Sequence, residues 1–324
     1  MKYQRFGKSD MDVSVICLGN WASGEKRWGK VEESDAIRAT RLAVDLGVNF
    51  FDTAKAYGWG LSEQVLGKSL EGIRHKVHVT TKMGRRPRLD GQPGIGPVDL
   101  SPQTYQKSIE ESLRNLRTEY VDLFMAHAYD GITPLDEMAG GFEHLREQGK
   151  IRWWGVSSFS PKWLPVLAKY PGFVGYQGLL NLVEKDAMDE IIPFCVSSSI
   201  GFMGFTPLGM GLLTGKYDTL PEFETDDVRT GRYYFTPEGF AAAQPGIAVM
   251  RRIANERGVT PAQIATAWVL HAGATVAVVG YKSEAQVKDN TSAGSLELDE
   301  AEVKELDLVF QGTSSNEDRY GVNS

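Results

Sequence analysis

The chain has few cysteines and no long apolar run, and each shortage excludes a class of protein. Its two cysteines, Cys17 and Cys195, stand in no CxxC or ligand-like spacing, which argues for a reducing compartment and against a disulfide framework. No apolar stretch approaches the ~20 residues that cross a bilayer, and the N-terminus lacks the apolar segment of a secretory signal. We therefore expect a cytoplasmic protein that makes no membrane contacts.

Basic side chains are also fewer than acidic ones: the chain has 35 Lys and Arg residues against 42 Asp and Glu residues, which gives a net charge of −7. This balance disfavours general binding to nucleic acid or anionic membranes, although a few local cations could still hold a phosphate-bearing cofactor. The length of 324 residues suits two average domains or one α/β barrel. Since no linker, low-complexity segment or short repeat is visible, we expect a single domain over residues 1–324.

What the chain does contain is a recurring pair of patterns, an apolar strand followed by an amphipathic helix. The strand patterns cover residues 12–19, 48–54, 76–82, 120–127, 151–158, 173–179, 200–208 and 275–281. The helical patterns cover residues 33–47, 62–72, 101–118, 135–149, 161–170, 189–199, 250–258 and 260–273, and a last helix follows the eighth strand. This alternation predicts an α/β fold, a (β/α)8 TIM barrel, with an open doubly wound sheet as the alternative.

Turn and cap residues mark the boundaries of these elements. Helix starts are expected at Ser34, Ser101, Ser160 and Thr260, and helix ends at Gly47, Gly149 and Gly258. Residues 2–14 read as a small β-hairpin that covers the bottom of the barrel. Residues 83–100 and 208–239 are too long for plain connections, and long loops after barrel strands usually shape the active-site face.

Polar side chains stand where three neighbouring strands end. Asp52 ends the second strand, Lys82 the third and His127 the fourth, while Tyr57 follows in the loop after the second strand. In a barrel these groups converge on one mouth. A nearby ammonium lowers the pKa of a tyrosine, an aspartate keeps that ammonium charged, and a histidine can hydrogen-bond a substrate oxygen. Together they could protonate a carbonyl oxygen as a hydride reaches its carbon.

Each of these residues also has a simpler interpretation. Asp52 and Lys82 could form a structural ion pair, His127 could be a core histidine, and Tyr57 could be a loop aromatic. Lys55 ends no strand, so a solvated loop cation is the favoured interpretation there. It is the joint placement of the four residues that favours catalysis.

Six sequence blocks resemble the successive signatures of the aldo/keto reductases: FFDTAKAYG, TTKMG, YVDLFMAHAYD, IRWWGVSSFS, GFTPLGMGLLTGKY and VVGYKSEAQVKDN. They occur in family order, and the resemblance covers about residue 3 to residue 309. They most resemble the bacterial branch of inositol-operon and general-stress reductases. The resemblance implies a barrel that binds NADP(H), with NAD(H) possible. It also implies a catalytic tetrad of Tyr57 as general acid, Lys82 tuning it, Asp52 holding Lys82, and His127 orienting the carbonyl.

The same resemblance implies residues that contact the cofactor. The carboxamide would be read by Ser157, Ser158 and Gln177, and the nicotinamide ring would stack on Phe205. The 2′-phosphate would meet Lys282, although a helix-cap cation is the alternative for that lysine. Ser283 and Gln286 would donate there, Asp289 and Asn290 would contact adenine, and Leu208, Gly209 and Lys216 would line the pyrophosphate. Further cofactor positions are Gly19, Asn20 and Trp21 at the end of the first strand, together with Asp52, Thr206, Pro207, Gly211, Leu213 and Gly280 within these blocks.

Two positions depart from the family pattern. Ser158 replaces the usual asparagine, which puts its amide contact in doubt. Gln286 stands where many members have arginine, which weakens the preference for NADP over NAD. Substrate-binding candidates are Trp21, Tyr57, Trp59, His127 and Tyr129, and they suit a small hydrophobic or aromatic carbonyl or alcohol. Arg85, Arg86 and Arg88 could attract anionic substrates, although a solvated loop is the favoured interpretation.

Other functions are possible on this sequence. The stretch GMGLLTGKY is close to the pattern of a nucleotide-binding P-loop but does not match it, since Met210 stands in place of the required glycine and Tyr217 in place of Ser or Thr. The strand–GxGxxG–helix fingerprint of a dinucleotide-binding fold is absent from the sequence as well. A cofactor-binding regulatory protein on the same fold is the alternative to an enzyme. A lyase or metal hydrolase is a remote third, because the five histidines form no HxH strand pair, and we expect no metal. The substrate and any oligomeric state are not derivable.

Overall fold

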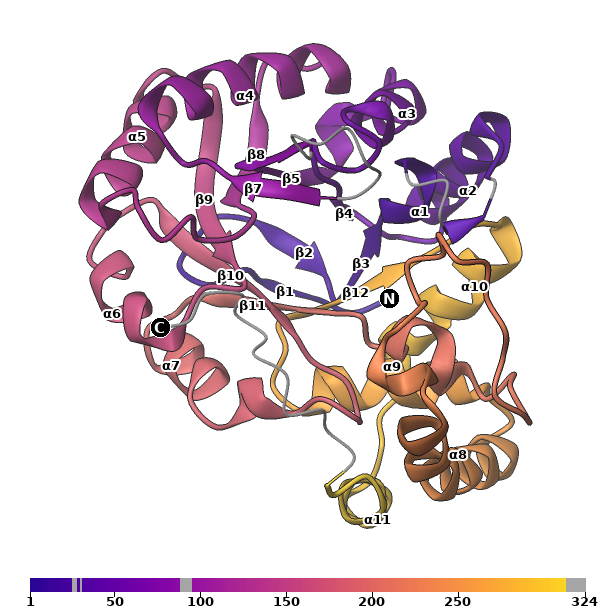
Figure 1. Cartoon of the computed structure of the whole chain (residues 1–324). Helices are drawn as coiled ribbons and strands as arrows, with labels where there is room; N and C mark the ends of the chain where they lie inside the picture. Colours follow the sequence, from indigo (N-terminus) through magenta and orange to yellow (C-terminus); the bar gives the residue numbers. More distant parts are fainter. Residues whose placement is uncertain (25–27, 30, 88–94, 313–324) are drawn as a thin grey trace.

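A closed barrel of eight parallel strands organises the chain, which we describe from a computed structural model (Figure 1). The structure describes residues 1–24, 28–29, 31–87 and 95–312. Around the barrel the strands are β3 (Ile16–Gly19), β4 (Phe50–Asp52), β5 (His78–Met83), β8 (Val121–Ala126), β9 (Ile151–Ser157), β10 (Phe173–Leu179), β11 (Gly201–Phe205) and β12 (Val276–Gly280), and β12 pairs with β3 to close the ring. The predicted (β/α)8 fold is therefore confirmed.

Helices surround the barrel and return the chain from each strand to the next (Figure 1). Those that follow the strands in order are α2 (Glu33–Asp45), α3 (Leu61–Ser69), α4 (Pro102–Leu116), α5 (Leu135–Glu147), α6 (Leu164–Leu167), α7 (Ile191–Ser197), α9 (Pro261–His271) and α10 (Glu284–Ser292). Three more are α1 (Trp21–Gly24), α8 (Pro237–Arg257) and α11 (Glu300–Val309). Short 3-10 helices are η2 (Arg74–Lys76), η3 (Pro161–Trp163), η4 (Asp186–Met188), η5 (Gly209–Thr214), η6 (Tyr233–Phe235) and η7 (Ala293–Ser295).

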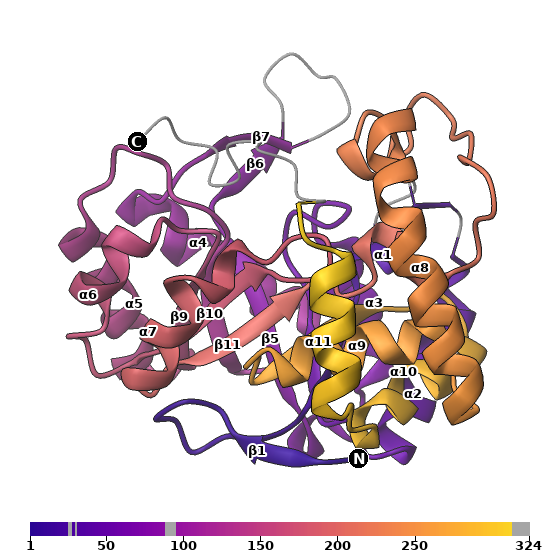
Figure 2. The same ribbon diagram turned by 90° about the horizontal axis from the view of Figure 1, so that it is seen from below.

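The expected N-terminal hairpin is present as β1 (Tyr3–Arg5) and β2 (Asp12–Ser14), paired antiparallel at the N-terminal ends of the barrel strands (Figure 2). From it Phe6 enters the barrel, with its ring 5.6 Å from that of Phe50. Two glycines make room for this ring, because a Cβ on Gly201 would lie 2.6 Å from Phe6 and one on Gly175 would lie 3.0 Å away. Phe6 therefore seals the bottom of the barrel and leaves the opposite end as the mouth.

The long segment after β5 folds as a second hairpin, β6 (Arg85–Pro87) with β7 (Ile95–Val98), on the side of the barrel away from β1 (Figure 2). The loop after β11 begins earlier than expected, because Thr206 leaves the strand conformation and the residues to Leu208 form a turn. The helix expected over 250–258 is much longer, since α8 starts at Pro237, with Thr236 as its N-cap, and runs through Pro245.

The expected caps are correct at some helix ends and wrong at others. Thr260 forms a capping box with Gln263 at the start of α9, and Gly258 ends α8 with a left-handed φ of 66°. Ser34 is not a cap, because α2 starts one residue before it and its N-cap is Glu32. In the part of the chain that the structure describes, no helix is long and apolar enough to cross a membrane.

Candidate active site

The four predicted catalytic side chains meet at the mouth of the barrel. Lys82, fully buried, contacts both carboxylate oxygens of Asp52, at 2.7 and 2.8 Å from its Nζ. The same Nζ donates to the Thr53 carbonyl at 2.9 Å and to the Tyr57 hydroxyl at 3.3 Å. The ring of His127 lies edge-on to that of Tyr57, with 5.8 Å between centroids. Asp52, Lys82 and Tyr57 thus form one continuous hydrogen-bonded chain, with the imidazole beside it.

The strands explain this convergence. Asp52 is the last residue of β4, Lys82 is the next-to-last of β5, and the two strands are paired. His127 directly follows β8, and its backbone N–H donates to the carbonyl of Met83 at 2.9 Å, which continues the ladder between β5 and β8. Three adjacent strands therefore fix three of the four groups on rigid backbone.

Electrostatics set the charge of each group. Burial alone would lower the pKa of Lys82, but the Asp52 carboxylate and Tyr57 outweigh it and raise that pKa, so Lys82 is an ammonium. Burial raises the pKa of Tyr57 and outweighs the opposite effect of Lys82. The predicted lowering effect of Lys82 on the pKa of Tyr57 is therefore present, but burial outweighs it, and the phenol is protonated at neutral pH.

His127 is neutral for a related reason. Burial of its ring, and then the positive charges of Lys82 and Arg85, lower its pKa well below the usual value. Its Nδ1 is buried and has no hydrogen-bond partner among the described residues. A neutral imidazole with a free ring nitrogen can donate a hydrogen bond to, or accept one from, a ligand oxygen.

Unpartnered buried polar atoms cluster around this mouth. Eight side-chain atoms of the described residues are buried without a partner, and five of them belong to residues at the C-terminal ends of barrel strands or in the segments that follow. Those five are Ser23 Oγ, Trp28 Nε1, Arg85 Nε, His127 Nδ1 and Thr206 Oγ1. Because buried polar groups in folded proteins normally have partners, this cluster is a candidate place for a polar ligand.

The backbone is also unusual there. Ser158, Thr206 and Met210 have left-handed φ angles of 56°, 55° and 54°, and each follows a strand of the barrel or lies in the loop beyond it. For a β-branched residue such as Thr206 this conformation is a true outlier. Strained backbone of this kind concentrates at ligand-binding sites.

The predicted cofactor residues occupy one continuous arc of the barrel. Except for Asp52, which ends β4 and belongs to both predicted sets, they stand at the C-terminal ends of β9, β10, β11, β12 and β3, or in the segments that follow these strands. The five strands are consecutive neighbours, whereas the predicted catalytic residues stand on or directly after β4, β5 and β8. The two predicted sets therefore lie side by side at one mouth.

Several predicted cofactor side chains already have partners within the protein. The Asn20 side chain is held by the Leu18 and Asp52 carbonyls and by the Tyr281 hydroxyl. Gln177 Nε2 donates to Asp52 Oδ1 at 2.9 Å, and Asn290 Nδ2 donates to the Gly280 carbonyl at 3.1 Å. The polar groups of these three side chains therefore bind within the protein, to residues at the ends of the barrel strands.

The predicted residues beside and within α10 also have structural roles. Ser283 is the N-cap of this helix, and the Gln286 side chain accepts from the Lys282 backbone N–H at 2.7 Å. Asp289 accepts from Thr260 at 3.0 Å and from Gln263 at 2.8 Å, which ties α10 to α9. Lys282 precedes this helix, and its Nζ donates to the carbonyl of Trp28.

Arg229 is a further candidate site residue that the sequence did not reveal. The long loop after β11 brings its guanidinium to 5.5 Å from the ring of Trp28, and Lys282 Nζ lies 5.8 Å from the same ring. Burial, together with the charges of Arg229 and Lys216, lowers the pKa of Lys282, so the three cations are close enough to repel one another. Asp227 balances part of this charge through its 2.7 Å ion pair with Arg229. The remaining positive charge suits a phosphate.

The predicted substrate residues border the tetrad to different degrees. Trp21 stacks on Tyr57 with 5.9 Å between ring centroids. Trp59 is 43% exposed, and Tyr129 packs against Phe159 while its hydroxyl donates to the Thr133 carbonyl at 3.0 Å. Lys55 forms an ion pair with Glu111, so it is a structural cation rather than a freely solvated one.

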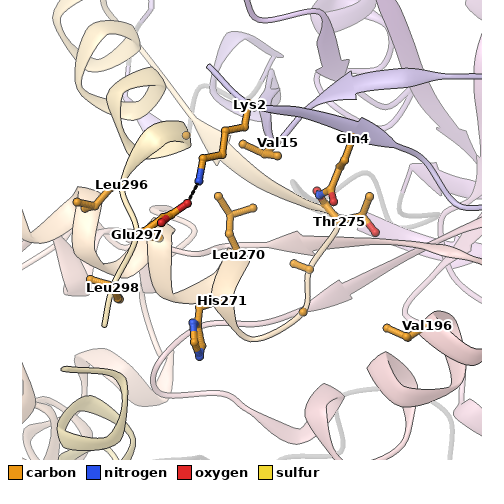
Figure 3. A pocket seen from close by; sticks show the side chains of 14 residues that line it. Lys2, Gln4, Val15, Val196, Leu270, His271, Thr275, Leu296, Glu297 and Leu298 are labelled. Carbon is orange, nitrogen blue, oxygen red and sulfur yellow. Dashed lines mark hydrogen bonds and ion pairs between the residues drawn. The ribbon is translucent and has the colours of Figure 1, made fainter. Parts of the chain in front are cut away.

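A cavity of about 580 Å³ lies elsewhere, at the bottom of the barrel (Figure 3). It is lined by the N-terminal hairpin, the end of α9 and residues 294–298, and Lys2 and Glu297 pair across it. It contains no predicted site residue. Among the described residues, no group of three or more His, Cys, Asp or Glu side chains could hold a metal ion.

Comparisons with known proteins agree with this geometry. The model of the aldo/keto reductase family matches residues 15–310. Aldo-keto reductase YhdN of Bacillus subtilis (strain 168) is 29% identical over 320 residues, which cover 98% of this chain and 96% of that protein. Probable aldo-keto reductase 1 of Glycine max is 30% identical over 304 residues, covering 93% of this chain and 87% of that protein.

Solved structures give the same result. Glycerol dehydrogenase AKR11B4 from Gluconobacter oxydans superposes with a TM-score of 0.87 at 31% identity, covering 95% of this chain and 94% of that one. An aldo/keto reductase from Klebsiella pneumoniae, in complex with NADP and acetate, superposes with a TM-score of 0.74 at 26% identity, covering 98% and 97%. The chain therefore belongs to the aldo/keto reductase family, a family of oxidoreductases.

Proposed function

We propose that the protein is an NADP(H)-dependent oxidoreductase that reduces aldehydes or ketones to alcohols, reversibly. One observation carries the proposal: the buried ammonium of Lys82 joins the carboxylate of Asp52 to the hydroxyl of Tyr57 at the open end of the barrel. An ion pair with a purely structural role would not need a tyrosine hydroxyl as its third member.

The residues present fit a dinucleotide. The unpartnered Trp28 Nε1, Thr206 Oγ1 and Ser23 Oγ offer hydrogen bonds beside the strand ends, and the cations Lys216, Arg229 and Lys282 offer charge for phosphates. The NADP complex of the Klebsiella relative supports the same class of cofactor here. Lys282 is our candidate for the 2′-phosphate, which would favour NADP over NAD.

When bound, the nicotinamide supplies a hydride to the carbonyl carbon, or accepts one from the alcohol. Tyr57, protonated at neutral pH, donates its proton to the carbonyl oxygen as negative charge develops there. Lys82 stabilises the resulting phenolate, and the Asp52 carboxylate keeps Lys82 charged and in place. The neutral His127 hydrogen-bonds the carbonyl oxygen and orients it toward the Tyr57 hydroxyl. The phenolate then recovers a proton from solvent.

Two measurements test this function. The first is a fluorescence titration of the protein with NADPH and with NADH, repeated on Lys282→Met. Tighter binding of NADPH than of NADH, with the difference reduced in the variant, is expected. The second is NADPH oxidation with a panel of aldehydes and ketones. Tight NADPH binding without any turnover would instead support a cofactor-binding regulatory protein, and no binding of either cofactor would contradict both functions.

A further inference from the structure

Arg85 stands at the mouth but has no role in the chemistry described so far. It is the first residue of β6 and lies two residues beyond Met83, whose carbonyl holds the backbone of His127. The turn between them depends on Gly84, which has a φ of 104° and would place a Cβ 2.8 Å from Leu100. This turn starts the hairpin directly at the end of the strand that carries Lys82, and Arg85 pairs with Val98 across it.

The guanidinium of Arg85 is partly buried and unpaired. Its Nε is buried without a hydrogen-bond partner, and no carboxylate of the described residues pairs with it. The next residue shows the ordinary arrangement, because Arg86 pairs with Asp99 and donates to Thr104 Oγ1 at 2.7 Å. A buried cation without a partner is costly, so an unpaired arginine at a mouth calls for an anion that arrives from outside.

The charge of Arg85 acts on the catalytic group. It contributes to the lowered pKa of His127, and it opposes the rise in the pKa of Tyr57. Burial lowers the pKa of Arg85 itself, and Tyr57 opposes this change. The guanidinium therefore lies near the phenol and the imidazole, on the β5 side of the mouth and away from the arc of strands assigned to the cofactor.

We propose that Arg85 binds an anionic group of the substrate, and that the preferred substrates are small aldehydes or ketones that carry a carboxylate or a phosphate. The inference rests on the proposed function, because the reacting carbonyl must sit at the Tyr57 hydroxyl. Arginine presents a planar fork of donors that fits either anion, and it would hold the anion while the carbonyl faces Tyr57 and His127. The hydrophobic carbonyls favoured by the sequence would then be poorer substrates.

The test compares matched substrates. Steady-state kinetics with NADPH are measured for the three carboxybenzaldehyde isomers and for their methyl esters, in which a methyl group replaces the negative charge of the carboxylate. Glyceraldehyde 3-phosphate and glyceraldehyde form the phosphate pair. The proteins are the wild type, Arg85→Met, Arg85→Lys and the neighbouring control Arg86→Met. Because a hydrogen bond to a charged group is worth roughly one to two powers of ten in binding, we expect the wild type to prefer at least one anionic member by about tenfold or more in kcat/KM.

Arg85→Met should abolish this preference, mainly through KM, while Arg85→Lys restores part of it and Arg86→Met keeps it. The thermal midpoint of Arg85→Met should not fall, since the variant removes an uncompensated charge. A clear fall in the midpoint, with the preference for anionic substrates intact, would assign Arg85 a purely structural role. Turnover of the uncharged members without any anionic preference would overturn the inference and leave the proposed function standing. No turnover of any compound would overturn both. The substrate pair that shows the preference identifies the anionic group that Arg85 binds, a carboxylate or a phosphate.

Discussion

Replacing Asp52 with asparagine should expose how much the buried ion pair contributes to stability. The Lys82 and Asp52 side chains are 0% and 5% exposed. Removing one partner of such a pair typically costs about 3–5 kcal/mol, because the other charge stays buried and uncompensated. We expect the low end, about 3 kcal/mol, since the Thr53 carbonyl and the new amide oxygen still accept from Lys82.

The same variant predicts a change in pH dependence. In the wild type the pKa of Lys82 in the folded protein is raised above its unfolded value of about 10.4. The contribution of Lys82 to the free energy of unfolding is therefore fully present below that pH and is lost as the pH rises through the folded pKa. In Asp52→Asn burial is no longer opposed by a carboxylate, and the folded pKa should fall below the unfolded one. Between the two values the unfolded chain binds more protons, so stability rises with pH.

The assay is equilibrium urea unfolding of both proteins at pH 7 and at pH 9, followed by tryptophan fluorescence and circular dichroism. The loss in the free energy of unfolding caused by Asp52→Asn, relative to the wild type, should be smaller at pH 9 than at pH 7. The control is Glu33→Gln, which removes a 2.8 Å pair to Lys68 whose side chains are 35% and 47% exposed, and which should cost less than about 1 kcal/mol. An Asp52→Asn deficit as small as that of the control, and equal at both pH values, would refute the reasoning.

Two further substitutions test the bottom of the barrel and its mouth. Gly201→Ala should destabilise the protein by about 1–3 kcal/mol, because the added Cβ would lie 2.6 Å from Phe6. Gly140→Ala is the control and should stabilise α5, because its Cβ would meet no atom within 4 Å and alanine favours a helix. Equal thermal midpoints for the two variants would contradict this prediction. Ser158→Asn should raise the thermal midpoint slightly and tighten NADPH binding, since asparagine tolerates the left-handed φ of 56° better than serine and restores the family's amide; a lower midpoint with weaker binding would count against both reasons.

The barrel and the tetrad could be predicted because their signals are local. Strands of a parallel barrel are buried on both faces and read as continuous apolar runs, so Asp52, Lys82 and His127 stand out where the runs end. Strand order then follows from the alternation with helices, and adjacent strand ends must lie together.

Other features depend on contacts that no local pattern encodes. Arg229 lies in a loop without periodicity, and its place beside Trp28 and Lys282 follows from how that loop folds back over the mouth. The raised pKa of Tyr57 reflects burial outweighing an ammonium, a balance that needs the three-dimensional surroundings. Ser34 was a reasonable cap candidate, but α2 begins one residue earlier, with Glu33 and Asp35 in its first turn.

The central claim, that Tyr57 delivers the proton, is tested most directly by Tyr57→Phe. The variant keeps the ring against Trp21 and His127 and removes only the hydroxyl that meets Lys82. With a carbonyl substrate from the panel, kcat should fall by about 10²–10⁴-fold while NADPH affinity is retained. Tyr170→Phe, which removes a hydroxyl bound to Asp136 away from the mouth, serves as the control. Wild-type turnover by Tyr57→Phe would contradict the account.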